Sequence, residues 1–133
     1  MTAQMGHGEV RVVVIDDDYY ANAAMSRLLE SAGFQVAGRA YDGLAGLALI
    51  KTTQPDFAIL DIEMPALDGL ELARQVRKEM ESPPFLIAIT GIAKHDSVFE
   101  AAGFDAHFGK PVDWPKLESL LASHSGPVLP SRN

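Results

Sequence analysis

The chain has 133 residues, a net charge of −7 at pH 7, 47% hydrophobic and 22% charged residues, and no cysteine. This length predicts one domain with one core, and the absence of cysteine excludes disulfides, thiolate zinc sites and cysteine nucleophiles. The negative charge argues against a nucleic-acid-binding face, which needs clustered Lys and Arg. No apolar run is long enough to span a membrane or to act as a signal peptide. We therefore expect a cytoplasmic domain that contacts neither nucleic acid nor membrane.

Two strand–helix units are predicted in the first part of the chain. Residues 1–9 are interpreted as a flexible tail, and the β-branched run 10–15 predicts a strand buried on both faces. Helical spacing follows, ended by Gly33, and residues 34–40 predict a second strand. Asp42 can cap a second helix. The apolar faces expected of these two helices are Met25, Leu28, Leu29 and Ala32, and Leu44, Leu47 and Ala48.

Three further units are predicted after Pro55, which ends the second helix. The strands are expected at 57–60, 85–89 and 105–108. The helices are expected from 69 to about 81, around Val98, Ala101 and Ala102 up to Gly103, and after Asp113 with Leu117, Leu120 and Leu121 on the apolar face. The domain is expected to cover residues 10–123, and residues 124–133 are interpreted as a C-terminal tail or linker.

Strict alternation of five strands with five helices predicts an α/β fold. Such a chain forms a doubly wound parallel sheet between two helical layers, a three-layer α/β/α architecture. The right-handed crossover rule limits the strand orders to a few. In an open parallel sheet, ligands bind outside the carboxyl ends of the strands.

Polar side chains suited to phosphoryl chemistry follow four of the five predicted strands. They are Asp16 and Asp17, Asp61, Thr90 and Lys110. Carboxylates gathered in a small space favour a divalent cation such as Mg²⁺, and an aspartate can attack phosphorus to give an acyl phosphate. A lysine ammonium and a threonine hydroxyl can hold the phosphoryl oxygens. The other aspartates near helix starts, Asp18, Asp42, Asp68 and Asp113, are interpreted as caps or turns.

Four motifs in family-like order give a resemblance that covers Val10 to Ala122. They are V-V-V-I-D-D-D, I-L-D-I-E-M-P-A-L-D-G, I-A-I-T-G and F-G-K-P-V. On these residues the chain resembles a response-regulator receiver domain, the phosphoacceptor of two-component signalling. The resemblance implies the flavodoxin-like, CheY-like sheet with strand order 2-1-3-4-5.

The resemblance also implies roles for individual residues. Asp61 would take a phosphoryl group from a histidine kinase or a histidine phosphotransfer protein. Mg²⁺, or Mn²⁺, would be bound by Asp17, Asp61 and the backbone carbonyl of Glu63, with Asp16 helping through water. Thr90 and Lys110 would contact the phosphoryl group. The bond between Lys110 and Pro111 is expected to be cis.

Two positions depart from the commonest family pattern. His107 stands three residues before Lys110, where the family usually has an aromatic residue that switches rotamer with Thr90. We therefore expect a muted side-chain switch, with movement of the loop that Gly91 begins. Glu63 lies beside the path of an attacking water, so we expect it to change the lifetime of the acyl phosphate, by repelling that water or by pairing with Lys110.

The leading interpretation is a phosphorylation switch and not an enzyme for an outside substrate. Its only catalysis would be phosphoryl transfer onto Asp61 and slow autodephosphorylation. A downstream protein would bind the face of the fourth helix, fifth strand and fifth helix. Two alternatives stay open: a Mg²⁺-dependent phosphohydrolase with an aspartyl nucleophile, and a degenerate receiver that only binds partners. The sequence also leaves open the kinase, the signal, the target and whether the chain forms a homodimer. It does not show whether the chain is a stand-alone protein or a domain of a longer one.

Overall fold

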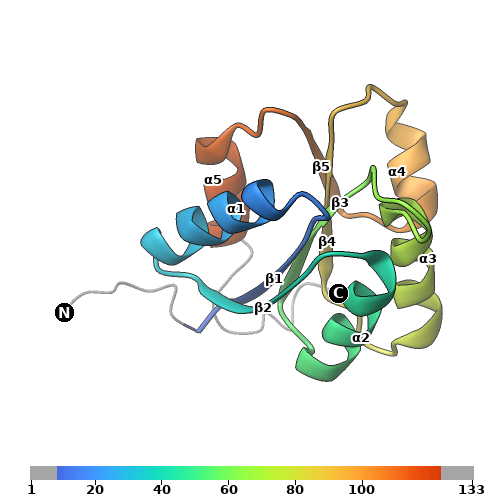
Figure 1. Cartoon of the computed structure of the whole chain (residues 1–133), viewed down its shortest axis with the longest axis horizontal. Helices are drawn as coiled ribbons and strands as arrows, with labels where there is room; N and C mark the ends of the chain where they lie inside the picture. Colours follow the sequence, from blue (N-terminus) through green and yellow to red (C-terminus); the bar gives the residue numbers. More distant parts are fainter. Residues whose placement is uncertain (1–8, 124–133) are drawn as a thin grey trace.

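Strands and helices alternate along residues 9–123, the part of the chain that the computed structural model describes (Figure 1). In chain order the elements are β1 Arg11–Ile15, α1 Tyr19–Ser31, β2 Gln35–Ala40, α2 Gly43–Thr53, β3 Phe57–Asp61, α3 Gly69–Glu79, β4 Phe85–Thr90, α4 Asp96–Ala102, β5 Ala106–Gly109 and α5 Trp114–Ser123. The tails predicted at the two ends fall on residues 1–8 and 124–133, outside the described residues, apart from Glu9.

The strands form one parallel sheet with the order β2-β1-β3-β4-β5. This confirms the predicted doubly wound α/β fold and the strand order that the family resemblance implied. The register pairs Ile15 of β1 with Leu60 of β3, and Thr90 of β4 with Gly109 of β5. The carboxyl ends of four strands therefore meet at one edge of the sheet.

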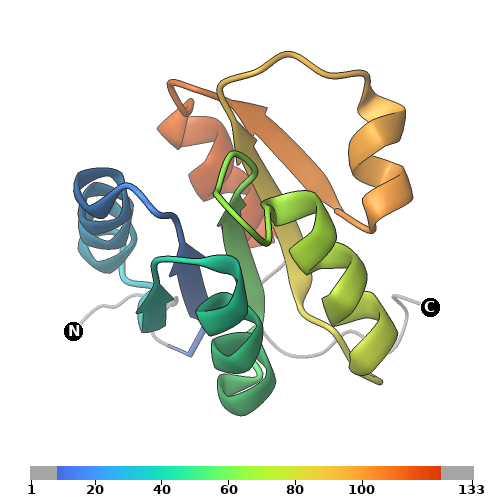
Figure 2. The ribbon, with the colours of Figure 1, turned by 45° about the vertical axis from the view of Figure 1, so that its right-hand side comes forward.

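The helices cover both faces of the sheet, so that the protein has three layers. Helices α1 and α5 lie on one side, and α2, α3 and α4 lie on the other (Figures 1 and 2). Alternate residues of β1 serve the two sides: Val12 and Val14 pack with α1 and α5, whereas Val13 and Ile15 pack against the opposite layer. Full burial of one such side chain contributes about 1.5–3 kcal/mol to the stability of the folded state.

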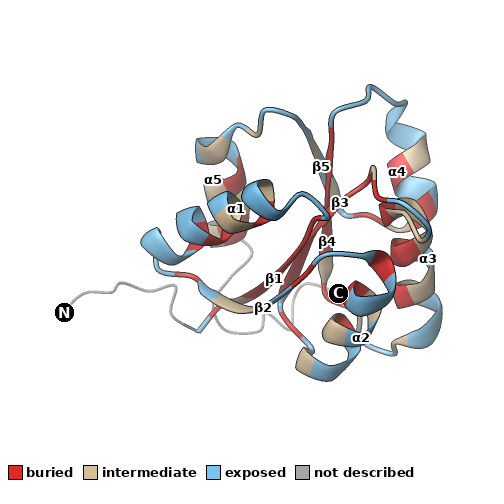
Figure 3. Ribbon diagram, viewed as in Figure 1, coloured by how far each residue is buried: buried red, intermediate tan, exposed pale blue. Residues whose placement is uncertain are grey.

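Strand β3 lies in the middle of the sheet and is buried along its whole length, up to and including Asp61 (Figure 3). Neighbouring strands take up its backbone hydrogen bonds on both sides, and helices cover both faces. This position explains why the run before Asp61 is apolar without alternation. It also means that the backbone of Asp61 is fixed by its neighbours.

The predicted helix caps are present. Asp18 accepts hydrogen bonds from the N–H groups of Tyr20 and Ala21, and Asp42 and Asp68 cap α2 and α3 in the same way. Gly33 has a φ of 95° directly after Ala32, the C-cap of α1, as its predicted helix-ending role requires.

The predicted buried faces of α1 and α2 are wrong in part. Leu28 is 42% exposed and Leu44 is 70% exposed. In α1 the buried positions are Asn22, Ser26 and Leu29, and in α2 they are Gly43, Gly46 and Ile50. The expected Ala48 of α2 and Ala101 of α4 are also exposed.

Close packing explains the orientation of α2. A Cβ added at Gly46 would lie 2.9 Å from side-chain carbons of Ile15, and one added at Gly43 would lie 2.2 Å from the carbonyl oxygen of Leu67. The helix turns Gly46 toward Ile15 of β1 and Gly43 toward Leu67 in the loop after β3, because a side chain larger than hydrogen would not fit at either contact. The leucine at position 44 is consequently turned to solvent.

The fifth strand begins and ends one residue later than predicted, at Ala106–Gly109. Asp105 borders the ladder: its backbone N–H donates to the carbonyl of Leu86 at 2.9 Å, and its carboxylate accepts from the N–H of Leu86 and from the guanidinium of Arg77, at 2.8 and 2.7 Å. Other bounds also move by one or two residues: α3 ends at Glu79, before the predicted 81, β3 and β4 extend to Asp61 and Thr90, and β1 and β2 begin one residue later than predicted.

Candidate functional site

Three carboxylates meet at the carboxyl ends of β1 and β3. One carboxylate oxygen from each of Asp16, Asp17 and Asp61 lies within 4.8 Å of the other two. Asp61 is 3% exposed, Asp16 is 9% exposed, and Asp17 faces solvent. The three carboxylates predicted to bind a metal are therefore adjacent, with an exposed side through which an ion could enter.

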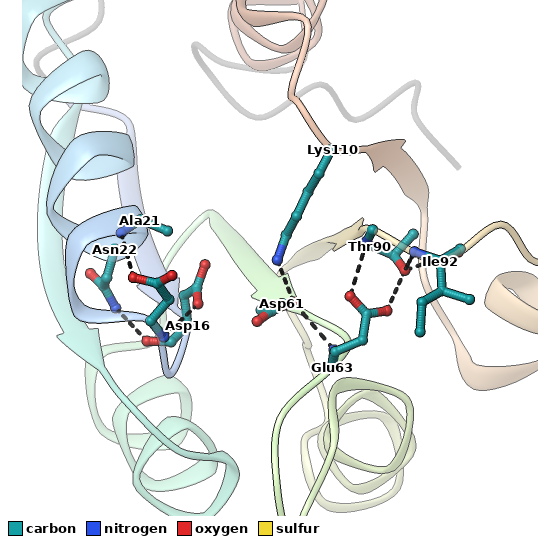
Figure 4. Close-up of polar contacts among 10 residues, drawn as sticks. Asp16, Ala21, Asn22, Asp61, Glu63, Thr90, Ile92 and Lys110 are labelled. Carbon is teal, nitrogen blue, oxygen red and sulfur yellow. Dashed lines mark hydrogen bonds and ion pairs between the residues drawn. The ribbon is translucent and has the colours of Figure 1, made fainter.

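The register of the sheet places Asp16 beside Asp61. Asp16 follows Ile15, which is paired with the residue before Asp61. The Oδ1 atom of Asp16 accepts a hydrogen bond from the N–H of Asp18 at 2.8 Å. The buried amide of Asn22 donates to the backbone carbonyls at the ends of β1 and β2, with distances of 3.2 Å to Asp16 and 2.9 Å to Ala40. Hydrogen bonds to both the carboxylate and the backbone carbonyl of Asp16 thus fix this residue at the end of β1 (Figure 4).

Burial and mutual repulsion raise the proton affinity of this cluster. Burial, and then the charge of Asp16, raise the pKa of Asp61 from 3.8 to about 6, although Lys110 opposes the shift. Burial also raises the pKa of Asp16, against the hydrogen bond from Asp18 and the charge of Lys110. Bringing these ionised groups together costs free energy, which a divalent cation bound among them would offset.

A lysine that follows β5 approaches Asp61. The Nζ atom of Lys110 lies 3.2 Å from Oδ1 of Asp61, and its backbone N–H donates to the carbonyl of Thr90 at 2.8 Å (Figure 4). Burial acts to lower the pKa of Lys110, but its hydrogen bond to Asp61 and the nearby acids outweigh it, so the pKa is raised. The amine is therefore protonated at neutral pH. The bond from Lys110 to Pro111 is cis, as the resemblance implied.

Glu63 forms a bridge between Asp61 and the end of β4. Its backbone N–H donates to Oδ1 of Asp61 at 3.2 Å. Its carboxylate accepts hydrogen bonds from the hydroxyl of Thr90 and from the N–H of Gly91, the latter at 3.0 Å (Figure 4). Among the described residues, Lys110 forms its ion pair with Asp61, and the Glu63 carboxylate bonds to Thr90 and Gly91 in place of the expected pairing with Lys110. The expected effect of Glu63 on an attacking water stays a prediction.

His107 is not part of this cluster. Its Nε2 lies 3.0 Å from Oδ1 of Asp96 in the first turn of α4, and its ring stacks on Phe99 with centroids 4.3 Å apart. The contact joins β5 to α4 on the outer face of the domain. Two of the four histidines, His7 and His124, lie outside the described residues.

Two residues that support the site were not identified from the sequence. Asn22 was not singled out, because an asparagine on a helix gives no sign that it will be buried. Gly69 packs directly against the end of β3: a Cβ added there would lie 2.5 Å from the carbonyl oxygen of Asp61 and 2.9 Å from the Cα of Ile62. The Asp-Gly pair at 68–69 was interpreted only as a turn and a helix start.

The fold and the acidic cluster define a flavodoxin-like α/β domain with a polar site at the carboxyl ends of its strands. Residues 12–122 match the family model of the response regulator receiver domain, and the chain belongs to that family. Receiver domains of response regulators are signalling domains, and they bind Mg²⁺ at an acidic pocket. The resemblance found in the sequence motifs is confirmed.

Individual relatives support the same conclusion. The chain is 38% identical over 118 residues to the response regulator MprA of Mycobacterium bovis (strain BCG / Pasteur 1173P2), with 85% of this chain and 48% of that protein covered. It thus spans about half the length of the curated relatives it matches. The signal receiver domain of NarL from Mycobacterium tuberculosis superimposes with a TM-score of 0.76 at 32% identity, covering 89% of this chain and 98% of the other. Vibrio cholerae CheY4 gives 0.77 at 25% identity, covering 87% and 98%.

The described residues contain no helix that is both long enough and apolar enough to cross a bilayer.

Proposed function

We propose that this chain receives a phosphoryl group on Asp61 and switches its binding to a partner in response. The observation that carries the proposal is the setting of the Asp61 carboxylate, buried between two further acids and the amine of Lys110. The donor would be the phosphohistidine of a histidine kinase or of a phosphotransfer protein. An oxygen of Asp61 forms the new bond to phosphorus, the bond from phosphorus to the histidine nitrogen breaks, and the imidazole leaves.

The chain's own residues divide the work. Asp16, Asp17, Asp61 and the backbone carbonyl of Glu63 would hold Mg²⁺ or Mn²⁺. Three carboxylates whose oxygens lie within 4.8 Å of one another are a donor set that fits a hard cation. When bound, the ion neutralises phosphoryl charge. Lys110 lies against Asp61 and would pair with a phosphoryl oxygen. Thr90 lies one strand away and would donate its hydroxyl.

The output would pass through the face formed by α4, β5 and α5. The loop 91–95 between Thr90 and α4 is exposed, and it begins at the site. A change in the hydrogen bonds of Thr90 therefore reaches α4, to which His107 of β5 is tied by its contacts with Asp96 and Phe99. We propose this face for the downstream protein, and a cytoplasmic location for the protein remains our prediction.

Phosphorylation of the purified chain tests the proposal. Incubation with Mg²⁺ and acetyl phosphate should add one phosphoryl group by intact mass, labile at alkaline pH and absent in Asp61→Ala. Chelation of the cation should abolish the reaction. An Asp56→Ala variant keeps the acceptor and should still be labelled, because Asp56 lies at the opposite end of β3. Steady turnover of many phosphoesters would instead support the phosphohydrolase, and no adduct with any donor would support the degenerate receiver.

A further inference from the structure

The carboxylate of Glu63 uses two hydrogen-bond donors at the end of β4. One of its oxygens accepts from the Thr90 hydroxyl and the other accepts from the Gly91 N–H. The hydroxyl oxygen of Thr90 in turn accepts from the N–H of Ile92 at 3.0 Å, and it lies 3.1 Å from the carbonyl oxygen of Ile92, a second acceptor within its reach. A hydroxyl has one proton to donate, so while it donates to Glu63 it has none for another acceptor.

An anion on Asp61 would need donors at this same position. The backbone of Glu63 is bonded to Oδ1 of Asp61, and a Cβ added at Gly91 would be 3.8 Å from Cδ of Lys110 and 3.9 Å from Oε1 of Glu63. The Glu63 carboxylate, the Lys110 side chain and Gly91 therefore surround the same space beside Asp61, to which Glu63 and Lys110 are both hydrogen-bonded. A phosphoryl group brings roughly two negative charges into that space, where the charge of Glu63 would repel them.

We propose that the Glu63 carboxylate is an internal competitor of the phosphoryl group. In the unmodified chain it occupies Thr90 and Gly91 and keeps the start of the loop 91–95 in place. Phosphorylation of Asp61 expels it, which frees the two donors and releases the loop. Glu63 thus acts as a positioning residue that lowers the affinity of the site for its own phosphoryl group and couples phosphorylation to loop movement. The inference rests on the proposed function of Asp61.

Binding of beryllofluoride, a tetrahedral mimic of an acyl phosphate, tests the competition. Glu63→Ala should bind it about tenfold more tightly than the wild type at saturating Mg²⁺, the ratio expected for one charge-assisted hydrogen bond. Glu63→Gln keeps an acceptor but no charge, and should fall between the two. Glu71→Ala is the matched control: it removes the same charge from α3, where Glu71 contacts Arg74 and Gln75, and should leave the affinity unchanged.

The Gly91 amide provides a second readout that does not depend on affinity. Its ¹H–¹⁵N resonance should shift in unmodified Glu63→Ala. In the wild type, the resonance should also move away from the chemical shift of the Glu63-bonded amide when beryllofluoride binds. Equal or weaker binding by Glu63→Ala, or a Gly91 resonance that Glu63→Ala leaves in place, would overturn the inference. If acetyl phosphate still labels Asp61 in that case, the competing role of Glu63 is refuted and the proposed function of Asp61 stands. A wild type that accepts neither phosphoryl group nor mimic would remove the proposed function as well.

Discussion

Replacement of Asp61 by Asn should stabilise the protein in buffer without divalent cations. Burial and the charge of Asp16 raise the pKa of Asp61 from 3.8 to about 6, and this value already contains the favourable effect of Lys110. At about 1.4 kcal/mol per pKa unit, the ionised carboxylate costs the folded state about 3 kcal/mol. Asn removes the charge but keeps a buried polar group, so we expect the free energy of unfolding to rise by about 1–3 kcal/mol at pH 7.5.

The pH dependence of this difference has a definite sign. The folded protein protonates Asp61 below about pH 6, whereas an unfolded aspartate protonates only near its ordinary value of 3.8. Between these limits the folded state binds more protons, so lowering the pH removes the penalty from the wild type. The stability advantage of Asp61→Asn should therefore be complete above pH 7 and should disappear as the pH falls to about 4.

Urea denaturation of both proteins at several pH values measures the difference. Glu100→Gln, which removes one charge from the exposed side of α4, is the control for net charge. Saturating Mg²⁺ should shrink the advantage of Asp61→Asn, because the cation stabilises the ionised cluster of the wild type. The reasoning fails if Asp61→Asn is no more stable than the wild type at pH 7.5 without Mg²⁺, or if its advantage grows on acidification.

Two further expectations concern packing around the site and its support. Gly69→Ala should lose about 1–3 kcal/mol of stability because the new Cβ would meet the Asp61 carbonyl oxygen at 2.5 Å, whereas Gly91→Ala, with its nearest contact at 3.8 Å, should change stability by less than about 0.5 kcal/mol. Equal urea midpoints for these two variants would contradict the packing argument. Arg77→Met should cost about 1–2 kcal/mol in the same assay, because it removes two hydrogen bonds, one of them an ion pair with Asp105 at 2.7 Å. An unchanged urea midpoint for Arg77→Met would show that solvent replaces both hydrogen bonds of Arg77.

The location of the site could be predicted because it depends on backbone features that sequence patterns report well. Apolar runs that end abruptly in Asp16, Asp61 and Thr90 mark the carboxyl ends of strands, and a parallel sheet brings such ends together. Helix starts at Asp18 and Asp42 were equally readable, since a capping side chain acts on its own neighbours.

Features that depend on the exact approach of two elements could not be predicted. The glycines of α2 look like poor helix formers in the sequence, and only the contact of Gly46 with Ile15 shows that they are the packing face. Asn22 is polar and yet buried, because three backbone carbonyls converge on its amide. The partners of Glu63 depend on a side-chain rotamer, which leaves no periodic trace in the sequence.

The lysine and the acids of the site belong to strands with different local stability. Asp61 ends the central strand, whereas Lys110 directly follows β5, a four-residue edge strand that is only half-buried. Opening of an edge strand needs less free energy than opening of the sheet centre. We therefore expect fluctuations that withdraw Lys110 while the acidic cluster stays assembled. Amide hydrogen exchange in β5 would then report the fraction of time in which Lys110 is withdrawn from the site while the acidic cluster can still hold a cation.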